Sequence, residues 1–434
     1  MEVLREKVLS NDILRVLNIK PFLLMILSEF FSQFAFNMQH FVLIFIIYNI
    51  TRSNTAVSGM ILSFVIPSVL FSVITGVYVD RWSKKKILLY THLIRATLLL
   101  PFLIPSLHLG LIYILTFLIA VATQFFIPAE SAIIPSLVPK KLIISANAVF
   151  AFSLYTSMLI GYIFSGPVLL LLGRTYTIVF LILLFLISTF FVAGIKVANK
   201  QKELAKDDLS TTGNNYSLRR EASEIFVFIR KARKVMHALL MLTIAQAVIF
   251  MFAVLAPGYV TTILEAPLES LSVILIAPAG LGLGLGAFLL GSMHKKIKSK
   301  WLSQIGLLVV GIIFILLPFA SRVTSHDFVK DINYYLPHFL EINILHIIVV
   351  LAFIIGFAIS LVFIPSNATI QIETNEEMRG RMYGLLGSLI GAVSFLPVVL
   401  AGGLADLLGV GLVITGVGIL LVVLSICYVF LIKF

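Results

Sequence analysis

The chain has 434 residues, of which 60% are hydrophobic and 12% are charged, and its mean hydropathy is +1.09. Soluble proteins carry about 25% charged residues, so this composition excludes an ordinary soluble domain. Apolar runs long enough to cross a hydrocarbon core of about 30 Å as helices recur along the whole sequence. The sequence therefore predicts an all-α polytopic membrane protein.

The net charge of +12 invites a nucleic-acid interpretation, but the positions of the cations argue against it. The apolar runs predict twelve membrane-spanning helices, near residues 21–49, 57–79, 87–105, 109–127, 146–172, 176–195, 238–263, 271–292, 302–320, 342–364, 382–404 and 411–432. With a cytoplasmic N-terminus, 27 of the 32 Lys and Arg residues fall in cytoplasmic segments. This asymmetry is typical of cytoplasmic loops. We therefore expect a multi-pass protein of the cytoplasmic membrane with both termini in the cytoplasm and no nucleic-acid partner.

In chain order, the sequence divides into four segments. Residues 1–20 form a basic amphiphilic lead, which we expect to lie on the inner membrane surface. Residues 21–195 hold the first six helices. The polar segment 196–237 is predicted to be a cytoplasmic linker, and residues 238–434 hold the other six helices.

The first helix is the most polar one. Its residues Glu29, Gln33, Asn37 and His40 fall on one face about 80° wide at 100° per residue. Glu29 should lie about 10–12 Å below the inner surface, where burial disfavours an anion and a carboxyl could load and release a proton. The alternative is a static partner for Arg95, and the sequence does not decide between the two.

Arg95 is predicted near the middle of the third helix. A cation at that depth needs an anionic partner or a cluster of carbonyl groups. It is a second candidate for proton coupling, but it could also bind an anionic group of a substrate or form a structural ion pair. His40 and His92 are expected to be hydrogen-bonded helix residues, since neither has neighbours suited to metal binding.

The fourth helix runs into a proline-rich stretch. Pro128, Pro135 and Pro139 predict that the helix breaks into a cytoplasmic elbow, because proline removes a backbone donor and restricts the residue before it. The letters FIPAES at 126–131 reappear as FIPSNA at 363–368, an offset of 237 residues. This repeat predicts two six-helix halves related by duplication.

Between the second and third helices the chain reads Gly76-Val-Tyr-Val-Asp-Arg-Trp-Ser-Lys-Lys-Lys86. It resembles the G-x-x-x-D-R-x-G-R-[RK] signature of the major facilitator superfamily, with Ser83 and Lys84 in place of a glycine and an arginine. The resemblance implies twelve helices in two pseudo-symmetric six-helix bundles that rock about a central site.

Two further stretches are similar to the branch that holds macrolide-efflux proteins and the enterobactin exporter. They are the elbow after Phe126 and the arginine–glycine pattern from Arg379 to Gly384. Gly161, Gly166 and Pro167 resemble the antiporter motif of the fifth helix, although leucines stand where that motif has paired glycines. The resemblance implies efflux, with antiport supported more weakly.

The resemblance also implies a gating latch. Asp80 could sit against the N-terminus of the eleventh helix, where the helix dipole favours an anion. Arg81 and Lys84 could pair with Glu130, or with an acid of the second half. The residues of the predicted latch are Gly76, Asp80, Arg81, Lys84, Glu130, Arg379 and Arg381, with Glu373, Glu376 and Glu377 as further partners. For the lysines, a simple topology anchor is the better interpretation.

The remaining polar residues suggest a substrate cavity. Candidates are Gln33, Asn37, His40, Thr243 and Gln246, although polar side chains also serve helix–helix contacts. The glycines at 280–286 predict close helix packing rather than a phosphate loop. No metal cluster, cofactor motif or nucleophile–base set is present, which disfavours a membrane enzyme or receptor.

The sequence thus predicts a secondary transporter, not an enzyme. It would export a bulky amphiphilic compound, drug- or macrolide-like or siderophore-like, by proton antiport. Its expected partners are the small-molecule substrate, the proton and the lipid bilayer, and we expect a monomer. An importer or a lipid-handling permease of the same fold is the alternative.

Overall fold

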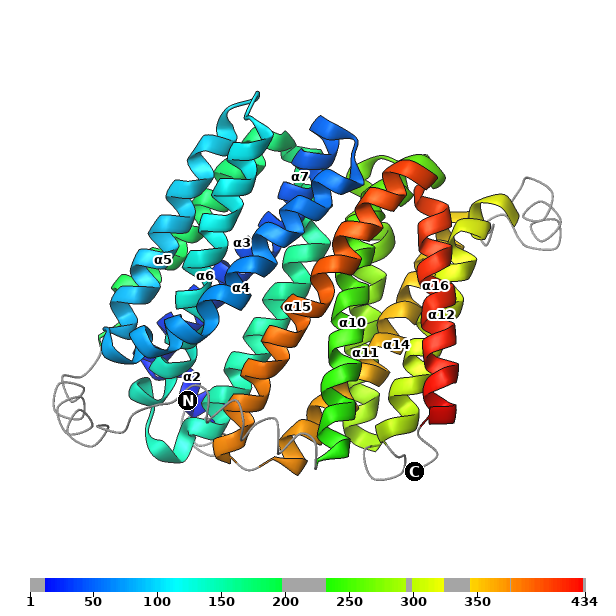
Figure 1. Ribbon diagram of the computed structural model, residues 1–434. Helices are drawn as coiled ribbons and strands as arrows, with labels where there is room; N and C mark the ends of the chain where they lie inside the picture. The colour runs from blue at the N-terminus through cyan, green and yellow to red at the C-terminus, as the bar shows by residue number, and fades with distance from the viewer. Residues whose placement is uncertain (1–11, 197–231, 294–298, 324–343, 375, 432–434) are drawn as a thin grey trace, which may run out of the picture. The chain divides into compact units, whose positions relative to one another are not determined.

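The described chain is helical throughout. The computed structural model describes residues 12–196, 232–293, 299–323, 344–374 and 376–431, and these contain no strand. In this part of the chain, 11 helices are long and apolar enough to cross a membrane. One of them, Lys140–Ala193, has 54 residues, and Gly173 at φ 71° interrupts it. Since it is about twice the length that a bilayer needs, it holds two spans, and the predicted twelve helices are confirmed. Figure 1 shows the helices coloured in chain order.

The chain forms two compact units. Unit 1 consists of residues 1–43 and 63–217, and unit 2 of residues 44–62 and 218–434. The division runs through the first two membrane helices, so a short stretch of the N-terminal sequence, 44–62, belongs with the C-terminal helices. The predicted linker lies almost wholly outside the described residues, as does most of the lead at 1–20.

Unit 1 is built on helices that follow one another in the sequence. They are α2 (Asp12–Leu17), α3 (Lys20–Thr51), α4 (Asn54–Arg81), α5 (Lys84–Leu99), α6 (Leu109–Leu137) and α7 (Ile143–Ala193), where α3 and α4 contribute only their parts within 1–43 and 63–217. The short helix α2 packs on α7, and its Val16 is fully buried. The part of the lead that is described is therefore partly embedded in the protein. Helix α5 packs against both α6 and α7.

Unit 2 contains the second set of spans. They are α10 (Arg233–Gly258), α11 (Ala277–Met293), α12 (Ser299–Val323), α14 (Ile344–Glu373), α15 (Glu376–Leu408) and α16 (Val410–Leu431). Helix α14 packs against α10, α11 and α12, while α12 also contacts α16 and α10 contacts α15. Two π-helical turns, Tyr259–Ile263 and Ser272–Ile276, flank the connection from α10 to α11.

The prediction that prolines break the fourth helix is wrong. Helix α6 continues through Pro128 and Pro135 and ends at Leu137. Helix α14 likewise continues through Pro365 to Glu373. A proline in a membrane helix frees only the carbonyl one turn earlier, and neighbouring helices or local adjustment satisfy it.

The two helices also confirm the 237-residue repeat. Shifted by that offset, α6 would span 346–374, and α14 spans Ile344–Glu373. The equivalent prolines, Pro128 and Pro365, lie about 20 residues after the start of their helices. The repeated letters therefore reflect a repeated structural element.

Close packing explains the glycine run of α11. A Cβ on Gly282 would collide with the carbonyl of Phe353 in α14, and one on Gly286 with the hydroxyl of Ser360. Gly284, two residues from each, has open space around it. The glycines thus let α11 approach α14 along one face, as the sequence predicted.

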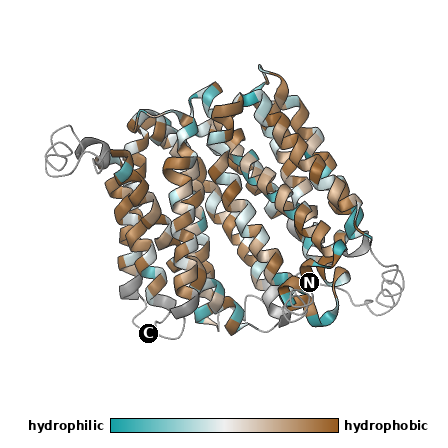
Figure 2. Cartoon of the chain, turned by 180° about the vertical axis from the view of Figure 1, so that it is seen from behind, coloured by the Kyte–Doolittle hydropathy of each residue, from teal (hydrophilic) through white to brown (hydrophobic). Residues whose placement is uncertain are grey.

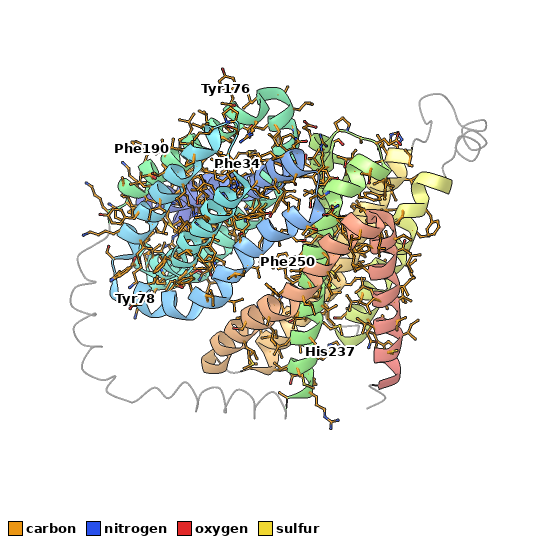
Figure 3. All side chains as sticks on the ribbon, turned by 45° about the horizontal axis from the view of Figure 1, so that its top comes forward. Phe34, Tyr78, Tyr176, Phe190, His237 and Phe250 are labelled. Carbon is orange, nitrogen blue, oxygen red and sulfur yellow. The ribbon has the colours of Figure 1, made fainter. Side chains whose placement is uncertain are left out.

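The outer surfaces of the helices are apolar, as lipid contact requires. Figure 2 shows hydrophobic residues along the length of the helices. Figure 3 shows Tyr176 and Phe190 projecting from unit 1, and their exposed fractions are 70% and 75%. In unit 2, the side chain of Phe288 is 76% exposed. Exposed aromatic side chains of this kind are typical of a surface that faces the membrane.

Candidate functional site

Three charged side chains meet inside unit 1. Glu29 comes from α3, Arg95 from α5 and Glu130 from α6, and they are 1%, 1% and 3% exposed. Each of the two carboxyl groups interacts with the other and with Arg95. Gln33, one turn after Glu29, interacts with both carboxyl groups. The cluster thus holds one cation and two acids in the buried core of unit 1.

Aromatic rings surround the guanidinium group. Its carbon lies 4.4 Å from the ring centre of Phe126, 5.2 Å from that of Phe36 and 5.8 Å from that of Phe185. A cation over the face of an aromatic ring gains electrostatic energy, and the gain grows when water is excluded. The rings therefore help to hold Arg95 in place and keep the cluster dry.

A chain of hydrogen bonds leads away from Arg95. Nη1 donates to Ser32 Oγ at 3.4 Å, and Ser32 Oγ lies 3.4 Å from Nδ1 of His92. The other ring nitrogen, Nε2, is 3.3 Å from Ser28 Oγ, which donates to the carbonyl of Ser188 at 3.0 Å.

A neutral imidazole ring satisfies these contacts. Because Ser28 donates onward, it accepts from Nε2–H, and Nδ1 accepts from Ser32. His92 is therefore a hydrogen-bonded residue, which agrees with the role expected from the sequence. Within the described residues, no group of three His, Cys, Asp or Glu side chains is placed to hold a metal ion.

The polar face of α3 continues from Glu29 along the helix. Asn37 is buried and donates from Nδ2 to the carbonyl of Gln33 at 2.7 Å. His40 is half-buried between the rings of Phe36 and Phe64, with centroids 4.4 and 4.1 Å away. Gln33, Asn37 and His40 thus share unit 1 with the cluster, and their role as a substrate cavity stays a prediction.

Glu130 is not where the predicted latch needs it. The sequence suggested a surface partner for Arg81 or Lys84, but Glu130 is buried and its charged neighbours are Glu29 and Arg95. The error follows from the proline prediction, since a helix that ended near residue 127 would have left Glu130 in a loop. Continuation of α6 carries it into the core.

The other latch residues are mostly beyond the described side chains. Gly76, Asp80, Arg81, Arg379 and Arg381 lie in α4 and α15, whose backbone is described there, but their side chains are not. Of the acids in the second half, Glu373 forms an exposed ion pair with Lys234 at 2.6 Å. Glu376 and Glu377 also lie outside the described side chains.

One lysine of the predicted connection between the second and third helices has a structural role. Nζ of Lys85 donates to the carbonyl groups of Ala193 and Ile195, at 2.8 and 2.7 Å. It therefore caps the C-terminal end of α7, where free carbonyl groups favour a cation. The neighbouring Lys84 is half-buried.

The motif of the fifth helix brings α7 close to α3. A Cβ on Gly161 would lie 2.8 Å from the carbonyl of Phe34 and 3.1 Å from Cβ of Asn37. Figure 3 labels Phe34 inside unit 1. Gly166 is buried, and Pro167 lies inside the helix. Gly161 is thus a packing residue next to the polar face of α3.

Thr243 and Gln246 belong to unit 2, on α10 between His237 and Phe250 of Figure 3. Thr243 is buried and donates to the carbonyl of Leu239 at 2.8 Å. Gln246 is half-buried. A role for the two in substrate binding stays a prediction.

One functional candidate was missed by the sequence analysis. Asp406, in the last turn of α15, accepts five hydrogen bonds, one from Ser53 and four from Asn54 and Thr55 at the start of α4. The sequence did contain an indication of this contact. An acid at the C-terminal end of a helix interacts unfavourably with the helix dipole, so it needs hydrogen-bond donors from another segment.

Comparisons with known proteins agree with this architecture. The Major Facilitator Superfamily model matches residues 25–396. An uncharacterised MFS-type transporter of Bacillus subtilis (strain 168), YvqJ, is 26% identical over 91% of this chain and 87% of its own.

Solved structures show the same fold at low identity. The nucleoside transporter NupG matches with a TM-score of 0.72 at 12% identity, over 94% of this chain and 99% of that one. A POT family transporter in complex with 5-aminolevulinic acid matches with a TM-score of 0.68 at 13% identity, over 94% and 95% of the two chains.

Proposed function

Because the chain belongs to the Major Facilitator Superfamily, we propose that this membrane transporter is a secondary transporter in which proton movement through the Glu29–Arg95–Glu130 cluster drives export of a bulky amphiphilic compound. Substrate export and its chemical class are supported by the likeness of the Phe126 and Arg379 stretches to efflux proteins. Proton coupling is supported by the buried cluster.

The observation that carries the proposal is the imbalance of charge in the cluster. Arginine keeps its proton in proteins, so Arg95 balances one carboxylate only. A second buried carboxylate would be an uncompensated charge in a low-dielectric core, which is costly. One proton held between Glu29 and Glu130 makes the cluster neutral. The two acids and the arginine therefore form a site for a single exchangeable proton.

The position of the cluster on α3 suggests how the proton meets the substrate. Gln33 borders both carboxyl groups, and Asn37 and His40 follow on the same side of the helix. A substrate group bound along this face would change the environment of Glu29 directly. Binding of substrate and binding of the proton would then oppose each other, which is the requirement for antiport.

Neutralising either acid tests the proton site without a known substrate. Infrared spectroscopy of purified protein at neutral pH should show the carbonyl band of a protonated carboxyl group. The band should be lost in both Glu29→Gln and Glu130→Gln, because the remaining carboxylate then pairs with Arg95. The exposed acid Asp12 supplies the control, since Asp12→Asn should leave the band unchanged. A band that persists in both buried variants would refute the shared proton.

The same variants test coupling and direction in inverted membrane vesicles that are acidified inside. Vesicles with the parent protein should accumulate a labelled macrolide against its gradient, whereas both buried variants should only equilibrate it. Accumulation by intact cells instead would show an importer.

A further inference from the structure

The start of α4 is tied to the end of α15 by one carboxylate, and both segments belong to unit 2. Oδ2 of Asp406 accepts from Ser53 Oγ at 2.6 Å, from Thr55 Oγ1 at 2.7 Å and from the Thr55 N–H at 3.0 Å. Oδ1 accepts from the N–H of Asn54 at 2.8 Å and from its Nδ2 at 3.0 Å. We call Asp406 and Ser53–Thr55 the Asp406 clasp.

The clasp satisfies the first turn of α4 from outside that helix. The first N–H groups of a helix have no partner within it, and its N-terminus attracts a negative charge. Ser53 supplies the local cap, since its Oγ accepts from the N–H of Ala56 at 3.2 Å while it donates to Asp406. Hydrogen bonds to an ionised acceptor are about twice as strong as those between neutral groups.

Close contacts continue the clasp along the same two helices. Ser58 Oγ donates to the carbonyl of Val398 at 2.9 Å. Gly402 leaves no room for a Cβ, which would lie 2.7 Å from the carbonyl of Asn54.

The end of α3 also contacts the second half of the chain, because Tyr48 Oη lies 3.0 Å from Thr261 Oγ1. The N-terminal segment 44–62 is therefore fastened to helices of the second half.

We propose that Asp406 is a gating residue, whose clasp closes the transporter on the side where α3 ends and α4 begins and opens once in each cycle. This inference rests on the proposed transport function, because alternating access requires this seam to part when substrate passes on that side. Positive-inside topology assigns this side to the exterior. Asp406 is exposed, so water can replace the five donors when the clasp opens. An exposed charged contact suits a gate better than a buried one, whose separation would strand charges.

A cysteine at Ser58 reports opening of the seam. Ser58 is 2% exposed and lies against Val398, so Ser58→Cys, in a Cys427→Ser background, should react slowly with a membrane-impermeant maleimide added to intact cells. Adding Asp406→Asn leaves one acceptor oxygen and turns an amide toward the donors. We expect labelling to become about tenfold faster, the factor that corresponds to about 1.4 kcal/mol. Glu269→Gln, which removes another acid of unit 2, should leave the rate unchanged.

Thr55→Val provides a second variant that keeps the charge of Asp406. It removes one hydroxyl donor, and labelling should rise by about threefold, as expected for one modest hydrogen bond. Equal labelling rates in the parent, Asp406→Asn and Thr55→Val proteins would overturn the gating role, as would an equal rise in Glu269→Gln. The assay uses neither substrate nor proton gradient, so its result is independent of the tests of coupling and export.

Discussion

The buried charge of Arg95 requires particular side chains around it. Its guanidinium group is 1% exposed and keeps its charge, so the fold must supply both counter-charges and aromatic faces. Glu29, Glu130 and three phenylalanine rings do so. Of its nitrogen atoms, Nε and Nη2 make no hydrogen bond within the described residues. Electrostatic attraction to the acids and rings therefore adds to the single hydrogen bond from Nη1 to Ser32.

Removing this charge should destabilise the protein. Arg95→Met leaves two buried acids without a cation, and breaking a buried charge pair costs about 3–5 kcal/mol. We expect the thermal unfolding temperature of the purified protein to fall. Replacing all three charges, as in Arg95→Met with Glu29→Gln and Glu130→Gln, should restore most of the loss, because neutral side chains of similar volume can replace a buried ionic group. A triple variant no more stable than Arg95→Met would contradict the assignment of the cluster.

The sequence predicted some of the residues of the Glu29–Arg95–Glu130 cluster. Glu29 and Arg95 could be recognised because each lies within an apolar run, where a charged side chain is costly and therefore indicates a function or a charged partner. Glu130 could not be assigned to them, since its place depends on α6 passing through Pro128 and on how three helices pack. The chain of Ser28, Ser32 and His92 also depends on tertiary contacts, and small polar residues in a membrane helix carry no signal of their own.

Helices are the elements that the sequence predicts well here, because hydrophobic length alone defines a span. Their ends are harder to predict. Helix α6 extends ten residues past the predicted end at 127, and α14 extends nine past 364. In both helices the last turns contain polar residues, so the apolar run in the sequence ends before the helix does. The energetic cost of proline within each helix is offset by contacts with the surrounding protein. Glycine spacing was the more reliable signal, as α11 shows.

The contact between α11 and α14 gives a test at the scale of the element. Gly282→Ala should destabilise the protein, because the added Cβ meets a backbone carbonyl that a side-chain rotation cannot move. We expect a loss of about 1–3 kcal/mol, as for overpacked cores. Gly284→Ala should be neutral or slightly stabilising, since the position is open and alanine favours helix by about 1 kcal/mol. Thermal unfolding of both variants measures this, and equal losses would contradict the proposed packing face.

The whole molecule is a duplication whose halves have diverged in charge. The repeat places Asn367 of α14 at the position of Glu130 of α6. Asn367 is uncharged, and its Oδ1 accepts from Tyr383 Oη at 3.1 Å. The acidic site is therefore a property of the first half. The sequence predicted the duplication from the aligned stretches FIPAES and FIPSNA, which share their first three letters, and from helix spacing. It did not predict which residues of segment 44–62 would pack with the second half, because that depends on contacts between distant segments.

Helices α4 and α15 each carry an acid in their last turn, Asp80 and Asp406. Asp406 caps the start of α4, whereas Asp80 was predicted from the sequence to cap the start of α15. The two acids would act at opposite membrane surfaces, so we expect them to stabilise opposite states of the cycle. Asp80→Asn should slow transport without loss of membrane insertion.

Double variants test directly whether Asp80 and Asp406 stabilise opposite states of the cycle. With the Ser58→Cys reporter, Asp406→Asn should speed maleimide labelling, while Asp80→Asn should slow it, because loss of the Asp80 contact favours the state in which the Asp406 clasp is closed. The two changes together should bring the rate back toward that of the parent, since opposing shifts in one equilibrium cancel. A rate that Asp80→Asn leaves unchanged would show that Asp80 serves only as part of a topology anchor, and that the clasp at Asp406 opens without a counterpart at the other surface.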